Sequence, residues 1–221
     1  MNIRSLFTFA LSSSFLLASS TASSQSLAGV KRYQIKSGVV EYTLSGTRKG
    51  TETIYFDNWG MREAKFTKAE MSMMGFTQKQ NTLTLLDGET TYNIDLDTKT
   101  GTKMETPMLK ELAANNKDLT EAGEKMMKSM GGVKIGTEVV LGKTCNVWEI
   151  RNMKSKTWVW KGVPLKTQVS MPSMEMTITA TKFDEGAAIA ADKFKIPSDV
   201  TITEGVDMKK MLEGMKTRKK N

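Results

Sequence analysis

The sequence predicts an α+β fold: one strongly curved antiparallel sheet with helices covering its concave face. Three observations lead to this prediction. Apolar and polar residues alternate through most of 33–106, and the alternation returns after residue 133, as in strands that bury one face. The residues between these two stretches have the composition of helices. A last amphipathic segment, at about 207–217, closes the chain.

The first strands are defined by their period of two and by the turns between them. In GVVEYTLSG, the residues Val40, Tyr42 and Leu44 fall on one face. The Asp-Gly pair at 87–88 is a tight-turn signal between two further alternating runs, and DNWG at 57–60 marks another turn. We therefore expect antiparallel neighbours with one face buried and the other in water.

A helical insertion is expected at about 107–131. Thr106 precedes Pro107, an arrangement that suits a capping residue followed by proline in the first helical turn. A second helix is expected to begin near Asp118, and the two glycines at 131–132 end it.

Strands return after the insertion in four runs: KIGTEVVLGKTCNVWEIR, KTWVWKGVPLKTQVSM, MEMTITATKFDEG and KFKIPSDVTI. Short turns that contain glycine or proline join several of them, and KGVP at 161–164 is the turn expected inside the second run. The C-terminal helix places on one side Met208, Met211, Leu212 and Met215.

Residues 1–24 have the features of a signal peptide. Arg4 supplies a positive start, an apolar run follows at 6–18, and small residues allow cleavage near 22–24. The apolar run is too short for a good membrane span, which takes about 20 residues. We predict an exported, periplasmic protein with a single domain at 25–221.

Composition excludes several kinds of chemistry. The chain has no histidine, so it cannot form a His-ligated zinc site, a Ser-His-Asp triad or a Cys-His dyad. Asp95 and Asp97 share a strand face, but two carboxylates alone are a weak signal for glycosidase chemistry. We predict that the protein is not an enzyme and has no cofactor. The single cysteine, Cys145, is interpreted as a buried inert thiol, with a reactive or intermolecular thiol as the alternative.

The formal net charge is +8, and the basic excess is concentrated in the C-terminal run MKKMLEGMKTRKKN. Such a surface suits anionic lipid headgroups or acidic partners, and export argues against nucleic acid. The expected partners are a lipid or an acylated protein, together with transient contact with an anionic membrane surface. The C-terminal helix itself is expected to dock into the open face of the sheet.

Several segments together resemble a known family. They are YQIKSGVVEYTLSG, GTETIYFDNWGMREAKFTKAEM, LGKTCNVWEI, KTWVWKGVPLKTQVSM and AADKFKIPSDV, and they span about 33–200. They resemble an uncharacterised family of exported bacterial proteins that carries a domain of unknown function related to the outer-membrane lipoprotein carriers LolA and LolB. This resemblance implies an incomplete β-barrel closed by helices, with an apolar cavity for lipid acyl chains. Its motifs are strand-and-turn features, and they assign no residue a role.

The chain contains 17 methionines, many of them in clusters. Three interpretations stand: core packing, the wall of a cavity that adapts to hydrophobic ligands, and a Cu(I) site, because thioether sulfur is a soft ligand. Met71 and Met73 are two apart, as are Met174 and Met176, so each pair projects from one face of its strand. The absence of histidine from the clusters disfavours copper.

The hypothesis is an exported, non-enzymatic protein that binds a hydrophobic ligand, either a lipid or the acyl chains of a lipoprotein, in the concave face. The alternatives are a Met-rich Cu(I)-binding periplasmic protein and a structural or partner-binding envelope protein without a small ligand. No metal ligand set is assigned. The residues predicted to line the cavity are Met71, Met73, Trp158, Trp160, Met171, Met174 and Met176.

Overall fold

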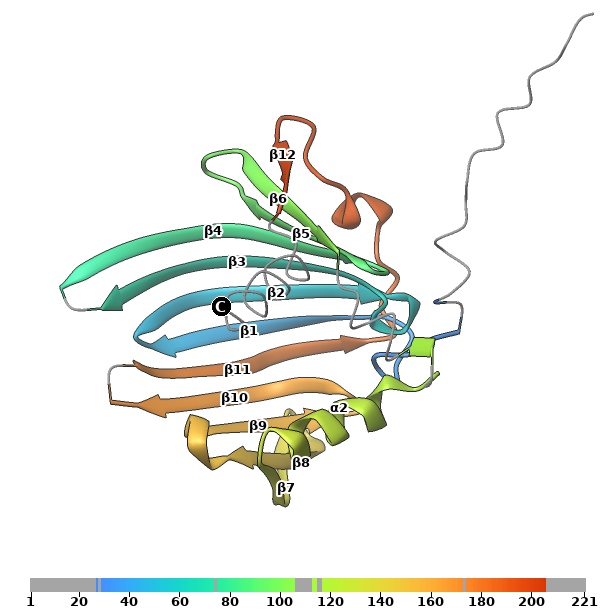
Figure 1. Ribbon diagram of the computed structural model, residues 1–221, viewed down its shortest axis with the longest axis vertical. Helices are drawn as coiled ribbons and strands as arrows, with labels where there is room; N and C mark the ends of the chain where they lie inside the picture. Colours follow the sequence, from blue (N-terminus) through green and yellow to red (C-terminus); the bar gives the residue numbers. More distant parts are fainter. Residues whose placement is uncertain are drawn as a thin grey trace, which may run out of the picture.

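The computed structural model describes residues 27, 29–73, 75–105, 113–114, 117–172 and 174–205. These residues form one large curved sheet that does not close into a barrel (Figure 1). The predicted signal peptide and the predicted C-terminal helix at about 207–217 lie outside the described residues, as does the start of the helical insertion at 106–112.

The described part has twelve strands in the order β12-β6-β5-β4-β3-β2-β1-β11-β10-β9-β8-β7. The strands are β1 (Gly38–Gly46), β2 (Arg48–Asp57), β3 (Arg62–Met73), β4 (Phe76–Asp87), β5 (Thr90–Asp95), β6 (Thr100–Glu105), β7 (Gly132–Val140), β8 (Lys143–Ile150), β9 (Ser155–Trp160), β10 (Val163–Met171), β11 (Met174–Glu185) and β12 (Thr201–Glu204).

The alternation predicted for the first strand is confirmed. Val40, Tyr42 and Leu44 are buried, and Glu41 and Thr43 between them are exposed. Strand β1 pairs with β2 on one side and with β11 on the other, and the latter pairing joins the two halves of the chain into one sheet. The sheet is therefore continuous, although a helical insertion separates its halves in the sequence.

Two details of the sheet differ from expectation. Strand β12 runs parallel to β6, so the sheet is mixed and not purely antiparallel. The run at 193–202 is not one strand, because Pro197 has no N–H to donate and interrupts it. It forms instead a 3₁₀ turn, η3 (Ala191–Phe194), and then the short β12. This segment covers β3–β5 with apolar side chains, among them Phe194, Ile196 and Ile202.

The turn predicted at 161–164 is shorter than expected. Only Lys161 and Gly162 form it, both with positive φ, and Pro164 lies inside β10. The pairing of β10 with β9 shifts register between Pro164 and Lys166. A bulge of this kind is where a strand tolerates proline.

The helix α2 (Leu119–Ser129) confirms the predicted second helix. Asp118 caps it, its side chain accepting a hydrogen bond from the backbone N–H of Thr120, and Gly131 follows its end with φ +80°. Two 3₁₀ turns, η1 (Asn58–Gly60) and η2 (Arg151–Met153), connect neighbouring strands.

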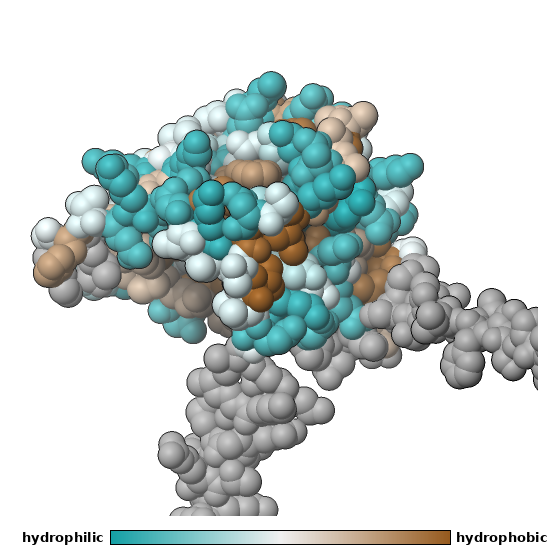
Figure 2. Space-filling view, turned by 90° about the horizontal axis from the view of Figure 1, so that it is seen from above, coloured by the Kyte–Doolittle hydropathy of each residue, from teal (hydrophilic) through white to brown (hydrophobic). Residues whose placement is uncertain are grey.

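Helix α2 lies at the β7–β9 end of the sheet (Figure 1). Among the described residues, the predicted helical cover of the concave face is therefore seen at that end alone. Within the described ranges, every helix is too short or too polar to cross a bilayer. Seen from the side of β12 and β6, the surface is mostly hydrophilic, with apolar patches between polar side chains (Figure 2).

Candidate functional site

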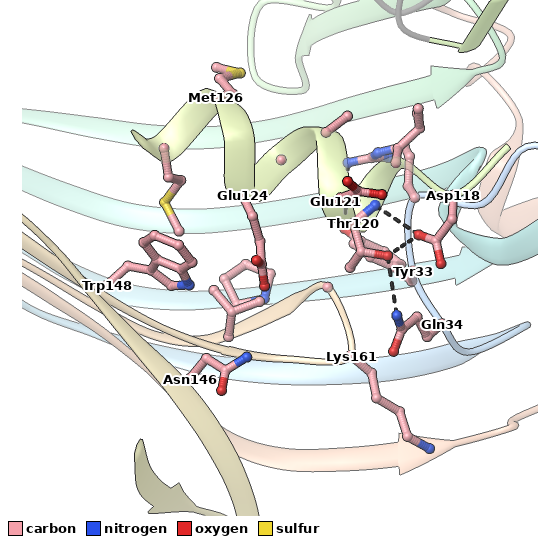
Figure 3. Close-up of a pocket in the computed structure, with 18 of the residues that line it drawn as sticks. Tyr33, Gln34, Asp118, Thr120, Glu121, Glu124, Met126, Asn146, Trp148 and Lys161 are labelled. Carbon is pink, nitrogen blue, oxygen red and sulfur yellow. Dashed lines mark hydrogen bonds between the residues drawn. The ribbon is translucent and has the colours of Figure 1, made fainter. Parts of the chain in front are cut away.

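A groove of about 610 Å³ lies between α2, strands β8–β10 and residues 32–34 (Figure 3). Ligand-binding pockets in proteins usually measure ~300–1,000 Å³. Its volume is therefore sufficient for a small ligand or for part of a larger one.

The floor of the groove comes from three neighbouring strands. Trp148 of β8 is opposite Thr157 of β9, and Asn146 is opposite Val159. Val159 in turn is opposite Pro164 of β10. Because side chains two apart on a strand share a face, Asn146 and Trp148 project to the same side, beneath α2. Trp148 is only 2% exposed and is the largest apolar side chain of this floor.

One wall of the groove is α2. Leu119 and Ala122 are buried and anchor the helix against Val30 and Met61. Gly123 lines the groove, and a Cβ atom built at this position would meet no other atom within 4 Å. Gly123 is exposed, so this position leaves room for a larger side chain at the edge of the groove.

The opposite wall is the segment at 32–34, which a buried polar cluster holds in place. The Tyr33 hydroxyl donates a hydrogen bond of 2.6 Å to Glu63 Oε2, and Arg32 donates one of 2.6 Å to the Gly60 carbonyl. Burial and the charge of Glu63 raise the pKa of Tyr33 well above its usual value. Tyr33 therefore stays a neutral hydrogen-bond donor at any physiological pH.

The turn after β9 also contacts this segment closely. A Cβ atom on Gly162 would lie 2.8 Å from the Arg32 carbonyl oxygen, and Gly162 has φ +84°. Both the contact and the conformation require glycine. The Gln34 N–H donates to the Lys161 carbonyl, so the segment and the turn are joined as one unit at the end of the groove.

The N-terminus of α2 meets the same unit. The Asp118 carboxylate accepts hydrogen bonds from the N–H and the hydroxyl of Thr120, and Gln34 Nε2 donates to that hydroxyl at 3.4 Å. Partial burial raises the pKa of Asp118, but the hydrogen bonds from Thr120 and Gln34 and the charge of Lys31 outweigh it. The pKa of Asp118 therefore lies below its usual value.

Most charged groups around the groove form ion pairs. Glu121 pairs with Lys125 at 2.9 Å, and Lys161 pairs with Glu185 at 3.5 Å. Lys128 lies 6.0 Å from the centre of the Trp148 ring. The part of the chain that the structure describes contains no group of three or more His, Cys, Asp or Glu side chains that could hold a metal ion. The floor of the groove thus combines the apolar side chains of Trp148, Val159 and Pro164 with the polar ones of Asn146 and Thr157.

The structure places the two predicted cavity tryptophans in the main core. Trp158 is 3% exposed and packs with Cys145, Val147 and Leu165, and Trp160 packs against the same cluster. The Trp158 indole N–H donates to Glu138 at 2.7 Å. The expectation that Cys145 is buried is confirmed, and burial raises the pKa of its thiol.

The predicted methionines lie where the hairpins turn. Met171 is directly opposite Met174, Met176 is opposite Val169, and Met71 is opposite Gln78. The side chain of Met73 lies outside the described residues. Neither these methionines nor Trp158 and Trp160 line the groove. Their role in a cavity wall stays a prediction.

Trp148, Gly123 and residues 32–34 are the groove residues that the sequence patterns do not single out. The sequence around Trp148 carries a weak signal for a site. Trp148 lies two residues after the polar Asn146, so the two share a strand face, whereas the other face of this strand buries apolar side chains. Met126 and Met127 stand out in the sequence only as an apolar stripe of a helix. The groove joins three segments that are distant in sequence, so local periodicity carries no information about it.

Comparisons with known proteins give a fold and no family. No protein-family model and no curated protein matches the chain. Among solved structures, an uncharacterised conserved protein from Thermus thermophilus is similar over 81% of this chain and 97% of that one, with 7% identity and a TM-score of 0.53. The resemblance to the LolA and LolB relatives stays a prediction.

Two further structures overlap more loosely. The Pseudomonas aeruginosa MucA/MucB complex is matched over 78% of this chain and 59% of that one, with 14% identity and a TM-score of 0.45. LprF from Mycobacterium bovis is matched over 76% of this chain and 91% of that one, with 11% identity and a TM-score of 0.34. Overlaps this loose bear on neither fold nor function. The Thermus protein supports the curved, unclosed sheet as the fold of this chain.

Proposed function

We propose that this protein is an exported, non-enzymatic binding protein that holds the apolar part of an amphiphilic ligand, such as a lipid or the acyl chains of a lipoprotein. The groove under α2 is the observation that carries the proposal. It combines sufficient volume, an apolar floor at Trp148, Val159 and Pro164, and a polar rim.

The energetic basis is the transfer of apolar surface out of water. Each methylene group that becomes buried contributes about 0.8 kcal/mol, so a short stretch of alkyl chain suffices for measurable affinity. A polar rim suits a ligand whose headgroup remains in water while its chain lies against Val159 and Pro164, which are partly exposed. Methionines on the helix side, Met126 and Met127, can adapt to chains of different shape.

The test uses Gly123, because a side chain at this position enters space that is otherwise open. Binding of N-phenyl-1-naphthylamine, a neutral fluorescent probe of apolar sites, is measured for the wild type, for Gly123→Ala and for Gly123→Trp. We expect Gly123→Ala to bind like the wild type and Gly123→Trp to lose affinity by about tenfold or more.

Circular dichroism and thermal unfolding check that both variants are folded. Native mass spectrometry of protein purified from its own cell envelope adds a second readout, in which lipid should co-purify with the wild type. The proposal fails if the wild type binds neither probe nor lipid, or if a folded Gly123→Trp variant binds the probe as tightly as the wild type.

A further inference from the structure

The Glu124 carboxylate is the feature of the groove that the binding of an alkyl chain leaves unexplained. Glu124 lies in the middle of α2, is half-buried and lines the groove. Figure 3 shows its side chain directed from the helix toward the sheet, beside Trp148. Among the described residues, no lysine or arginine lies within ion-pair distance of it, although α2 carries lysines at 125 and 128.

The neighbouring acidic groups differ from Glu124 in this respect. Asp118 is occupied in capping the helix, where it accepts hydrogen bonds from Thr120. Glu121 pairs with Lys125 one turn along the exposed side of the helix. A half-buried carboxylate without a counter-charge is unfavourable unless a cation can reach it. Glu124 is therefore the acidic group on α2 that is free to accept one.

The second element is the indole ring of Trp148 in the floor. The ammonium of Lys128 lies 6.0 Å from the ring centre, which is the outer limit of a cation–π contact. Since Trp148 is only 2% exposed, a cation inside the groove would meet the Glu124 carboxylate and only the exposed margin of the ring. The Glu124 carboxylate therefore supplies the attraction for an ammonium group through a charge-assisted hydrogen bond, and the indole borders it as apolar surface.

We infer that the groove selects amphiphiles whose headgroup carries a primary ammonium, which pairs with the Glu124 carboxylate. This inference rests on the proposed function, since it names the class of ligand for the same groove. A carboxylate or phosphate without a nearby amine would meet the unpaired negative charge of Glu124 and is disfavoured. The nearby Lys161 does not reverse this sign, because it is paired with Glu185 and its side chain is directed away from α2 (Figure 3).

The experiment compares three ligands with the same chain and different headgroups: dodecylammonium, dodecanol and dodecanoate. Each is titrated at neutral pH, below its critical micelle concentration, against the wild-type protein with bound N-phenyl-1-naphthylamine. We expect dodecylammonium to displace the probe at about tenfold lower concentration than dodecanol, and dodecanoate to be the weakest of the three.

Two charge-matched variants locate the effect. Glu124→Gln removes the unpaired carboxylate and should bring dodecylammonium to the affinity that dodecanol has for the same variant. Glu121→Gln removes a negative charge one turn away from Glu124, and the carboxylate that it removes is already paired with Lys125. This variant should keep most of the preference for dodecylammonium over dodecanol. Added salt should reduce the preference in the wild type.

The outcomes separate the two proposals. Equal displacement by dodecanol and dodecylammonium, or an undiminished preference in Glu124→Gln, overturns the ammonium site and leaves the proposed function intact. An equal loss of preference in Glu121→Gln and Glu124→Gln also overturns it, because the effect would then come from net charge. Failure of all three ligands to displace the probe overturns both proposals.

Discussion

Single residues fix the geometry of the groove through buried polar contacts as much as through apolar ones. Tyr33 is buried and edge-on to Phe56, with ring centres 4.9 Å apart, while its hydroxyl donates to Glu63. One side chain thus joins the apolar core to the polar cluster that holds Arg32. These contacts set the position of the wall opposite α2.

Replacing Tyr33 with phenylalanine should destabilise the protein by about 1–2 kcal/mol, because the Glu63 carboxylate loses its hydrogen-bond donor in a mostly buried site. Urea unfolding followed by fluorescence measures this change. Tyr55→Phe is the matched control, since Tyr55 packs edge-on to Phe66 through its ring. Equal stability of the two variants would show that the Tyr33 hydroxyl contributes nothing.

Helix α2 is the element that turns a sheet surface into a groove. Its sequence determines where it begins and ends, through the cap at Asp118 and the glycine after its last turn. Few of its side chains are buried, Leu119 and Ala122 being the main anchors. The helix therefore depends on its cap more than a fully packed helix would.

Asp118→Ala should lower the stability of the helix by about 1 kcal/mol, because the Thr120 N–H loses its acceptor. Asp118→Asn should retain most of the cap and serves as the control. Hydrogen exchange of α2 amides measures the local opening. The prediction is contradicted if both variants protect α2 equally well.

The same residue gives the helix a pH dependence of known sign. The pKa of Asp118 is lower in the folded protein than in the unfolded chain, where it is about 3.9. Its stabilising contribution is complete above the unfolded value and is lost as the pH falls through the folded value. Protection of α2 should therefore decrease in this acidic range in the wild type, and this part of the decrease should be absent in Asp118→Asn.

At the scale of the whole molecule, the two edges of the open sheet differ in how they are protected. Strand β12 is short, and ion pairs of Lys99 with Asp199 and of Lys103 with Glu204 surround it. Strand β7 is longer and exposes apolar side chains, Val139 with 68% exposed and Val133 with 51%. Exposed apolar edge strands are sites of unwanted association.

Val139→Lys should therefore reduce aggregation at high concentration and leave the melting temperature nearly unchanged, because the side chain that is replaced lies mostly in water. Light scattering during heating and storage measures aggregation. Thr137→Lys on the same strand tests whether any added charge has this effect. Unchanged scattering in Val139→Lys would exclude β7 as the association site.

Much of the fold is predictable because its elements carry local signals. The alternation in β1, the turn after Asp87 and the start of a helix near Asp118 each depend on residues close in sequence, and all three are confirmed. The parallel pairing of β12 and the break at Pro197 differ from expectation, since apolar residues alone do not give strand direction. The groove could not be predicted either, because it depends on how distant segments pack and not on local patterns. Trp148 lines a ligand site only because α2 and residues 32–34 pack over it.

The pairing of β1 with β11 has a consequence for how the chain acquires its structure. Residues 38–46 are among the first described ones to be synthesised, yet one of their two neighbours in the sheet is formed by residues 176–185. Strands β1–β6 can assemble as successive hairpins while the chain emerges, but one side of β1 lacks its partner until β11 has followed. Closing so long a loop is slow. The protein should therefore fold in two kinetic stages, with the central strand pair completed last.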